Sequence, residues 1–106
     1  MFYGRYGSTK QISDEIKAFI FAGTNDSDQH KILNQIEVCQ NFADFFSYEI
    51  VGIATEVETL FKSDVEFDAV IVTKYNRLSR NAFEFMQIKN KLLQDGKIII
   101  QAVRSY

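Results

Sequence analysis

The sequence lacks proline and tryptophan and contains one cysteine and one histidine among its 106 residues. The lone cysteine, Cys39, excludes an intramolecular disulfide and a thiolate metal cluster, and its place in an apolar helical stripe predicts a small buried side chain. We interpret His30, equally alone, as a surface or helix-start residue rather than a metal ligand. The sequence therefore predicts neither a metal site nor a cofactor.

Long apolar runs and an excess of positive charge are also absent. No stretch approaches the roughly 18 apolar residues that span a bilayer, and no signal-peptide pattern is present, so we expect a cytoplasmic protein without a membrane partner. The formal net charge of −2 at pH 7 gives no overall attraction to nucleic acid. Any contact with DNA should therefore be weak and should depend on local arginines.

The composition that remains is that of an ordinary globular domain. Hydrophobic residues make up 46% and charged residues 25% of a chain long enough for one modest core. We therefore expect a single domain over residues 1–106. Gly4 and Gly7 weaken the edge strand that the alternating aromatics near the start would favour, so residues 1–16 are interpreted as a peripheral extension.

Four compact apolar runs alternate with segments of helical periodicity. The runs span residues 17–23, 48–54, 67–73 and 97–103. The helical segments span residues 29–46, 55–62 and 81–94. Near-continuous apolar runs are typical of strands that are buried on both faces. The order predicts an α/β fold, a three-layer α/β/α sandwich with a mainly parallel four-stranded sheet and right-handed crossovers.

The two long helical segments carry apolar residues at intervals of three and four, which predicts one buried face on each. In the first segment, this face is expected to comprise Ile32, Leu33, Ile36, Cys39, Phe42, Ala43, Phe45 and Phe46. In the second, it is expected to comprise Ala82, Phe85, Met86, Ile88, Leu92 and Leu93. Gly96 is expected to end the second segment in the left-handed conformation.

Parallel strands place their carboxyl ends at one edge of a sheet, where the ligand-binding residues of such folds collect. The residues expected along this rim are 23–28, 54–58 and 75–80. Arg77 and Arg80 lie there at the start of a helix, and guanidinium groups together with helix N-terminal N–H groups favour a phosphate ligand. The alternative is that these arginines form ion pairs with Asp26 or Asp28 on the same rim.

The run Lys74–Asn81, which reads Lys-Tyr-Asn-Arg-Leu-Ser-Arg-Asn, resembles the "DRLSRN"-type signature of serine site-specific recombinases, the resolvase/invertase family. Residues 32–39 look like that family's "sLenQieac" helix, and residues 83–103 look like its next helix and strand. The resemblance implies a resolvase-like catalytic-domain fold. It also implies that Arg77 and Arg80 are catalytic and hold the scissile DNA phosphate.

The same resemblance has departures at the active site, beginning with Asn76 at the position of the family's aspartate. The family's first strand ends in a "YxRxS" motif that supplies an arginine and the nucleophilic serine. In the alignment that we prefer, Ala18–Asn25 is this strand, and the two positions fall on Gly23 and Asn25.

In a second alignment, Tyr3–Ser8 is the motif itself, with Arg5 as its arginine and Ser8 as the nucleophile. The serine position then falls on Gly7, with Ser8 one position late, and an insertion must precede Gln35. In either alignment we interpret Gln35 as a surface or rim hydrogen-bonder rather than a catalytic participant.

The segment Thr55–Asp68 is shorter than the corresponding loop of the family and contains no arginine, although that loop carries a further phosphate-binding arginine. Its carboxylates are interpreted as a solvated charge run rather than a metal site or an acid/base pair. They are Glu56, Glu58, Asp64, Glu66 and Asp68.

These losses matter because an amide such as Asn25 is no nucleophile, and Asn76 cannot accept a proton as a carboxylate does. The sequence therefore favours a recombinase-like domain that is catalytically inactive and acts as a protein-interaction or regulatory module, pairing with a recombinase or with its own copy. The alternative is an active recombinase that cuts and rejoins DNA through a phosphoserine on Ser8, assisted by Arg5, Arg77 and Arg80.

A third interpretation is a flavodoxin-like domain for a small ligand, although no glycine-rich phosphate loop supports it. The sequence ends at Tyr106, where the family continues into a dimerisation helix and a DNA-binding region. We therefore expect no DNA-binding domain and no recognition through groove contacts.

Overall fold

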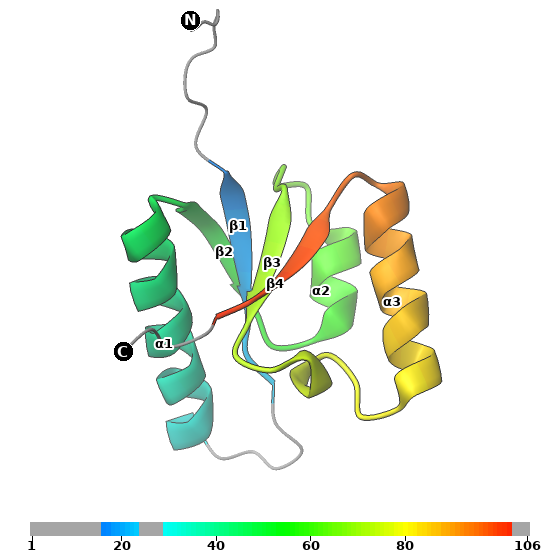
Figure 1. Cartoon of the computed structure of the whole chain (residues 1–106), viewed down its shortest axis with the longest axis horizontal. Helices are drawn as coiled ribbons and strands as arrows, with labels where there is room; N and C mark the ends of the chain where they lie inside the picture. Colours follow the sequence, from blue (N-terminus) through cyan, green and yellow to red (C-terminus); the bar gives the residue numbers. More distant parts are fainter. Residues whose placement is uncertain (1–15, 24–28, 103–106) are drawn as a thin grey trace, which may run out of the picture.

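The computed structural model of the protein describes residues 16–23 and 29–102 (Figure 1). The predicted peripheral extension over residues 1–16 lies outside this part of the chain, apart from Ile16. So do the rim residues 24–28 and Val103, the last residue of the fourth predicted strand.

The described residues form four strands and three α-helices in the predicted alternating order. The strands are β1 (Lys17–Phe21), β2 (Glu49–Ala54), β3 (Ala69–Val72) and β4 (Ile98–Gln101). The helices are α1 (Gln29–Phe46), α2 (Val57–Lys62) and α3 (Ala82–Gln94), and a 3-10 turn, η1 (Tyr75–Arg77), precedes α3. The four-stranded sheet has the order β2-β1-β3-β4, with every neighbouring pair parallel. The predicted α/β three-layer fold is therefore confirmed.

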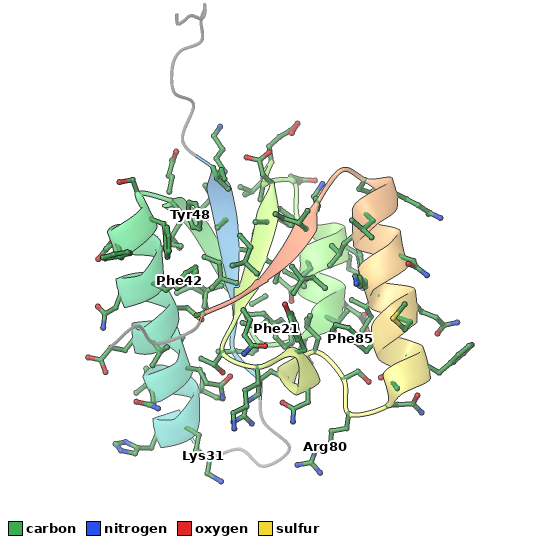
Figure 2. All side chains as sticks on the ribbon, viewed as in Figure 1. Phe21, Lys31, Phe42, Tyr48, Arg80 and Phe85 are labelled. Atoms are coloured by element: carbon green, nitrogen blue, oxygen red, sulfur yellow. The ribbon has the colours of Figure 1, made fainter. Side chains whose placement is uncertain are left out.

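Helix α1 covers one face of the sheet, and α2 and α3 cover the other (Figure 1). Successive residues of the inner strands point to opposite faces, so each strand supplies both layers. The α1 layer buries Ala18, Ile20, Cys39, Ala43, Ala69 and Ile71. The α2/α3 layer buries Phe19, Phe21, Leu60, Val70, Val72, Ile88 and Leu92. Figure 2 shows this division, with Phe42 and Tyr48 beside α1 and Phe21 and Phe85 on the other side.

Side-chain packing explains why a glycine, Gly52, lies in the middle of β2. A Cβ atom at this position would lie 2.4 Å from Cζ of Phe19 on the neighbouring strand, which is far inside van der Waals contact. Phe19 is buried and meets Phe67 edge-on, with ring centroids 4.9 Å apart. The glycine therefore makes room for the aromatic centre of the α2/α3 layer.

The predicted buried faces of the two long helices are wider than those in the structure, because several residues predicted to be buried are exposed. On α1, Leu33, Phe45 and Phe46 are 60%, 77% and 50% exposed. On α3, Met86 and Leu93 are 47% and 48% exposed, and Ala82 is exposed as well. A helix that packs against a single sheet buries only one stripe, so apolar residues outside that stripe face solvent.

Each of the two long helices is followed by a residue in the left-handed conformation. Gly96 has a φ of 77° and follows α3, as predicted from the Asp95-Gly96 pair. Ser47 has a φ of 61° and follows α1, a role that nothing in the sequence predicted. The backbone N–H of Tyr48 then donates to the carbonyl of Ala43 at 2.8 Å, which closes the end of α1.

Candidate anion-binding site

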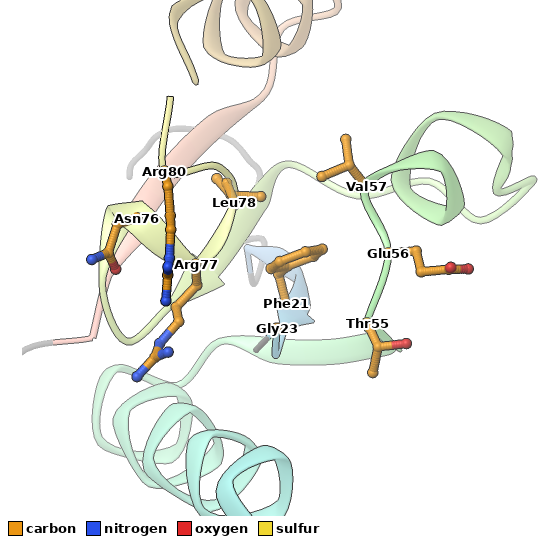
Figure 3. A pocket seen from close by; sticks show the side chains of 9 residues that line it. All are labelled: Phe21, Gly23, Thr55, Glu56, Val57, Asn76, Arg77, Leu78 and Arg80. Carbon is orange, nitrogen blue, oxygen red and sulfur yellow. The ribbon is translucent and has the colours of Figure 1, made fainter. Parts of the chain in front are cut away.

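The carboxyl ends of β1, β2 and β3 meet at one edge and enclose a pocket of about 310 Å³ (Figure 3). The pocket is lined by Phe21, Gly23, Thr55, Glu56, Val57, Asn76, Arg77, Leu78 and Arg80. Apart from Phe21, these residues come from the three segments that were predicted to share a rim. Of the predicted rim, residues 24–28 lie outside the described ranges.

Arg77 is held in this pocket by the 3-10 turn η1. The backbone N–H of Arg77 donates to the carbonyl of Lys74 at 3.0 Å, and that of Leu78 donates to Tyr75 at 3.1 Å. Leu78 is buried, so the turn is anchored to the core while the half-buried Arg77 side chain lies along the pocket wall. Core packing therefore fixes the backbone from which the guanidinium projects.

Within the described residues, two buried side-chain polar atoms have no hydrogen-bond partner, Nε of Arg77 and Oγ1 of Thr73. Buried polar groups in folded proteins are almost always paired, and a charged group without an acceptor is costly. Both atoms lie after β3, at the rim. Sequence reasoning missed Thr73, whose only signal was its place as the polar residue that ends an apolar strand.

The acidic and basic side chains of the pocket lie on opposite walls. Figure 3 shows the side chains of Arg77 and Arg80 extending to the same side, while Glu56 on the opposite wall points away from them. Asn76 lines the pocket beside the arginines and is exposed. The arginine side of the pocket therefore has the chemistry of an anion site.

Gln35 forms hydrogen bonds with Gly23, which follows β1 and lines the pocket. Its side chain accepts from the backbone N–H of Gly23 at 3.1 Å and donates from Nε2 to the carbonyl of Gly23 at 3.0 Å. Only 4% of Gln35 is exposed. Of the two predicted alternatives for Gln35, a hydrogen-bonder at the rim agrees with the structure, and a position on the helix surface is wrong because the side chain is buried.

Gly23 also marks a close approach between β1 and the loop that carries the arginines. A Cβ atom at this position would lie 2.9 Å from Cε2 of Phe21 and 3.0 Å from the carbonyl oxygen of Arg77. In the preferred alignment, Gly23 occupies the position of the family's first-strand arginine. A side chain at this position would therefore require the Phe21 ring and the backbone at Arg77 to shift.

The two alignments differ in which segment forms the first strand. β1 pairs with both β2 and β3 and is an inner strand, as the preferred alignment predicts. The structure brings together Arg77 and Arg80 of the predicted site residues. Arg5 and Ser8 lie outside the described residues, as do Asn25 and the acidic residues Asp26 and Asp28.

The described part of the chain contains no group of three or more His, Cys, Asp or Glu residues that could hold a metal ion. None of its helices is both long and apolar enough to cross a membrane. Among the residues of the acidic run, Asp68 has a structural contact, since Oδ2 accepts from the backbone N–H of Lys17 at 3.0 Å.

Comparison with known proteins places this architecture among recombinases. No family model matches the sequence, and no curated protein matches it. Among solved structures, the C-terminal catalytic domain of ISC1926 TnpA, an IS607-like serine recombinase, is similar with a TM-score of 0.72 and 25% identity over 85% of this chain and 72% of that one.

The N-terminal catalytic domain of TP901-1 integrase is also similar, with a TM-score of 0.65 and 18% identity over 81% of this chain and 76% of that one. The fold and the signature at Lys74–Asn81 agree with each other. The chain is thus similar to the catalytic domains of serine recombinases.

Proposed function

We propose that this recombinase-like domain binds a DNA phosphate through Arg77 and Arg80 and does not cut the strand. The observation that carries the proposal is the buried Nε of Arg77, which has no acceptor within the described residues. A phosphate oxygen would supply that acceptor and would relieve the cost of the buried donor. Arg80 adds a second guanidinium at the same pocket, and guanidinium groups bind phosphate oxygens in a fixed, planar geometry.

DNA is the proposed source of the phosphate because the fold is that of enzymes that act on DNA. The similar solved structures are those of a serine recombinase and an integrase. The net charge of −2 means that attraction is local to the rim, so binding should be weak and strongly weakened by salt.

The absence of strand cutting rests on the groups that the chemistry needs. Cleavage through a phosphoserine requires an activated hydroxyl directed at the phosphorus, together with cations that meet the developing charge. In the preferred alignment, the serine position is Asn25, the arginine position is the crowded Gly23, and the aspartate position is Asn76. A domain that holds DNA without cutting it would act as a regulatory or protein-interaction module.

The test is the binding of a fluorescent DNA duplex to the whole chain across a salt series. We expect affinity to fall as salt rises, and the Arg77→Ala, Arg80→Ala double variant to bind at least about tenfold more weakly. Its slope of log K against log salt should be shallower by about 1 for each phosphate that the variant no longer neutralises. The matched control is the Lys62→Ala, Lys89→Ala double variant, which removes the same charge from exposed positions outside the pocket. Equal losses of affinity in both double variants would contradict the proposal.

The alternative of an active recombinase is supported by the Tyr3–Ser8 motif and is tested on the same complexes. An active enzyme would form a covalent protein–DNA adduct that survives denaturation and disappears in Ser8→Ala. We expect no adduct with the wild-type chain. An adduct that depends on Ser8 would replace the inactive-module proposal while leaving the arginine site in place.

A further inference from the structure

A second pocket, of about 180 Å³, is formed by α3, the edge strand β4 and the turn η1. Figure 1 shows α3 beside β4 at one side of the molecule. The pocket shares no lining residue with the arginine pocket. Its lining consists of two aromatic rings, two aliphatic side chains and two lysines, which are Tyr75, Phe85, Leu93, Ile99, Lys89 and Lys97.

The aromatic and cationic residues occupy different parts of this pocket. Phe85, Lys89 and Leu93 follow one another at intervals of four, so they form one row along α3 that spans roughly 12 Å. At the start of this row, the ring of Tyr75 meets that of Phe85 with centroids 5.7 Å apart. At its end, the backbone N–H of Lys97 donates to the last turn of α3 at 2.9 Å. The pocket is therefore aromatic near η1 and cationic farther along the helix.

The two lysines give the pocket an uncompensated positive charge. No acidic residue lines it, and neither lysine has a carboxylate partner in the part of the chain that the structure describes. Nζ of Lys97 lies 4.7 Å from the centre of the Phe67 ring, an arrangement that positions the ammonium group without neutralising it. Two positive charges beside an apolar wall attract an anion more strongly than they would in open water. Charge complementarity therefore favours an anionic ligand.

We propose that this pocket binds a small aromatic carboxylate, with its ring against Tyr75 and Phe85 and its carboxylate at Lys89 and Lys97. Tyr75 is 46% exposed, so the aromatic pair can pack against a further ring, offset or edge-on. Binding sites for drug-sized molecules usually enclose roughly 300–1,000 Å³, so a pocket of about 180 Å³ fits one ring or two fused rings. A ligand of that size should bind with a dissociation constant of about 0.1–1 mM.

The test is a titration of the ¹⁵N-labelled whole chain with 2-naphthoate, followed by the amide NMR shifts. We expect saturable shifts at the lining residues of this pocket, with a single dissociation constant. The neutral 2-naphthamide has nearly the same shape and lacks the charge. It should bind at least about tenfold more weakly, because it forms no charge-assisted contact with the lysines.

A double variant tests the contribution of the lysines. Lys89→Gln, Lys97→Gln should weaken naphthoate binding about tenfold and leave naphthamide binding unchanged. The matched control is Lys62→Gln, Lys91→Gln, which removes the same charge outside the pocket. Lys91 lies over a ring as Lys97 does, with Nζ 4.3 Å from the centre of Phe61. The same spectra show whether each variant is folded.

Tyr75→Ala tests the placement of the ring. This change removes an aromatic contact and no charge, so naphthoate and naphthamide should both bind more weakly and by the same factor. Phe45→Ala is the control, because Phe45 is 77% exposed on α1. A loss confined to naphthoate would contradict the proposed orientation of the ligand.

Three results would overturn the proposal. Equal affinity for naphthoate and naphthamide would indicate an apolar surface with no preference for an anion. Shifts that centre on Arg77 and Arg80 and disappear in the Arg77→Ala, Arg80→Ala double variant would place the carboxylate in the arginine pocket. The third is the absence of saturable shifts at concentrations well above the expected dissociation constant. Because the titration contains no DNA and the arginine variant should retain naphthoate binding, a failure here is distinct from a failure of the proposed phosphate site.

Discussion

At the scale of single residues, the end of β1 at the rim is held by the side-chain amide of Gln35, which pairs with backbone groups. The Gln35 side chain presents one acceptor and one donor to Gly23, as a neighbouring strand would, at 3.1 and 3.0 Å. β1 ends at Phe21, so the ladder no longer pairs both groups of Gly23. The carbonyl oxygen of Arg77 lies close to Gly23, so the residue that Gln35 holds is next to the loop that carries the arginines.

Replacing Gln35 by leucine should therefore destabilise the protein, although the two side chains have similar volumes. The change leaves the N–H and the C=O of Gly23 buried without partners, and we expect the free energy of unfolding to fall by about 2–4 kcal/mol. Urea denaturation followed by circular dichroism measures this. Asn34→Leu on the exposed neighbour is the control, and an equal effect of both variants would show that the amide pair is unimportant.

Cys39 is a second residue whose environment makes a measurable difference. Burial raises the pKa of the Cys39 thiol from its ordinary 9.0 to about 12. The native state therefore disfavours the thiolate, and stability that is present below pH 9 is lost as pH rises toward 12. The weak contact of its Sγ with the carbonyl of Ile71, at 3.7 Å, does not change this direction.

We expect native Cys39 to resist alkylation at pH 8, where the unfolded chain reacts readily. The free energy of unfolding should fall more steeply above pH 9 in the wild type than in Cys39→Ala, since tyrosines and lysines titrate equally in both. Parallel pH profiles for the two chains would be inconsistent with a buried, protonated thiol.

At the scale of elements, the recombinase-like signature also builds the start of α3. Oδ1 of Asn81 accepts from the N–H groups of Phe83 and Glu84 at 2.9 and 3.1 Å. Ser79 accepts from the N–H of Asn81 at 3.1 Å and donates to the Glu84 carboxylate at 2.6 Å. The serine and the asparagine of the signature thus have structural roles, while the two arginines line the pocket.

Asn81→Ala should lower the free energy of unfolding by about 1 kcal/mol, because two N–H groups of the first turn lose their acceptor. Asn81→Asp keeps that acceptor and should retain most of the stability. Thermal and urea denaturation of both variants measure the difference. If Asn81→Asp lost as much as Asn81→Ala, capping would not explain the residue.

Element type and order could be predicted from the sequence because periodicity is a local property. The α1 boundaries Gln29–Phe46 agree with the predicted segment, and the predicted end of α3 at Gly96 is confirmed by its φ. Exposure could not be predicted as well. Met86 and Phe45 have helical spacing, but their burial depends on which layers exist around the helix.

The candidate site shows the same division between local and long-range information. Arg77 and Arg80 stood out because the signature is a continuous run. The pair of Gly23 and Gln35 was not predicted, since the two residues are 12 positions apart and meet only when α1 packs on the sheet. The crowding of Gly23 against Arg77 likewise exists only in the folded chain.

At the scale of the whole molecule, β3 links the two layers of the core. Ala69 and Ile71 face α1, whereas Val70 and Val72 face α2 and α3, and all four residues are fully buried. β3 also pairs with β1 on one side and β4 on the other. Loss of packing on either face therefore disturbs a strand on which the other face depends.

This linkage predicts that the described core unfolds as one unit. Ile71→Ala removes side-chain volume only from the α1 layer and should cost about 2–5 kcal/mol. Because opening is global, native-state hydrogen exchange should accelerate by the same factor in the slowest amides of α1 and of α3. Leu33→Ala, on an exposed position of α1, should change neither set. Protection that collapsed in α1 but stayed at the wild-type level in α3 would show instead that the two layers open independently and that β3 does not couple them.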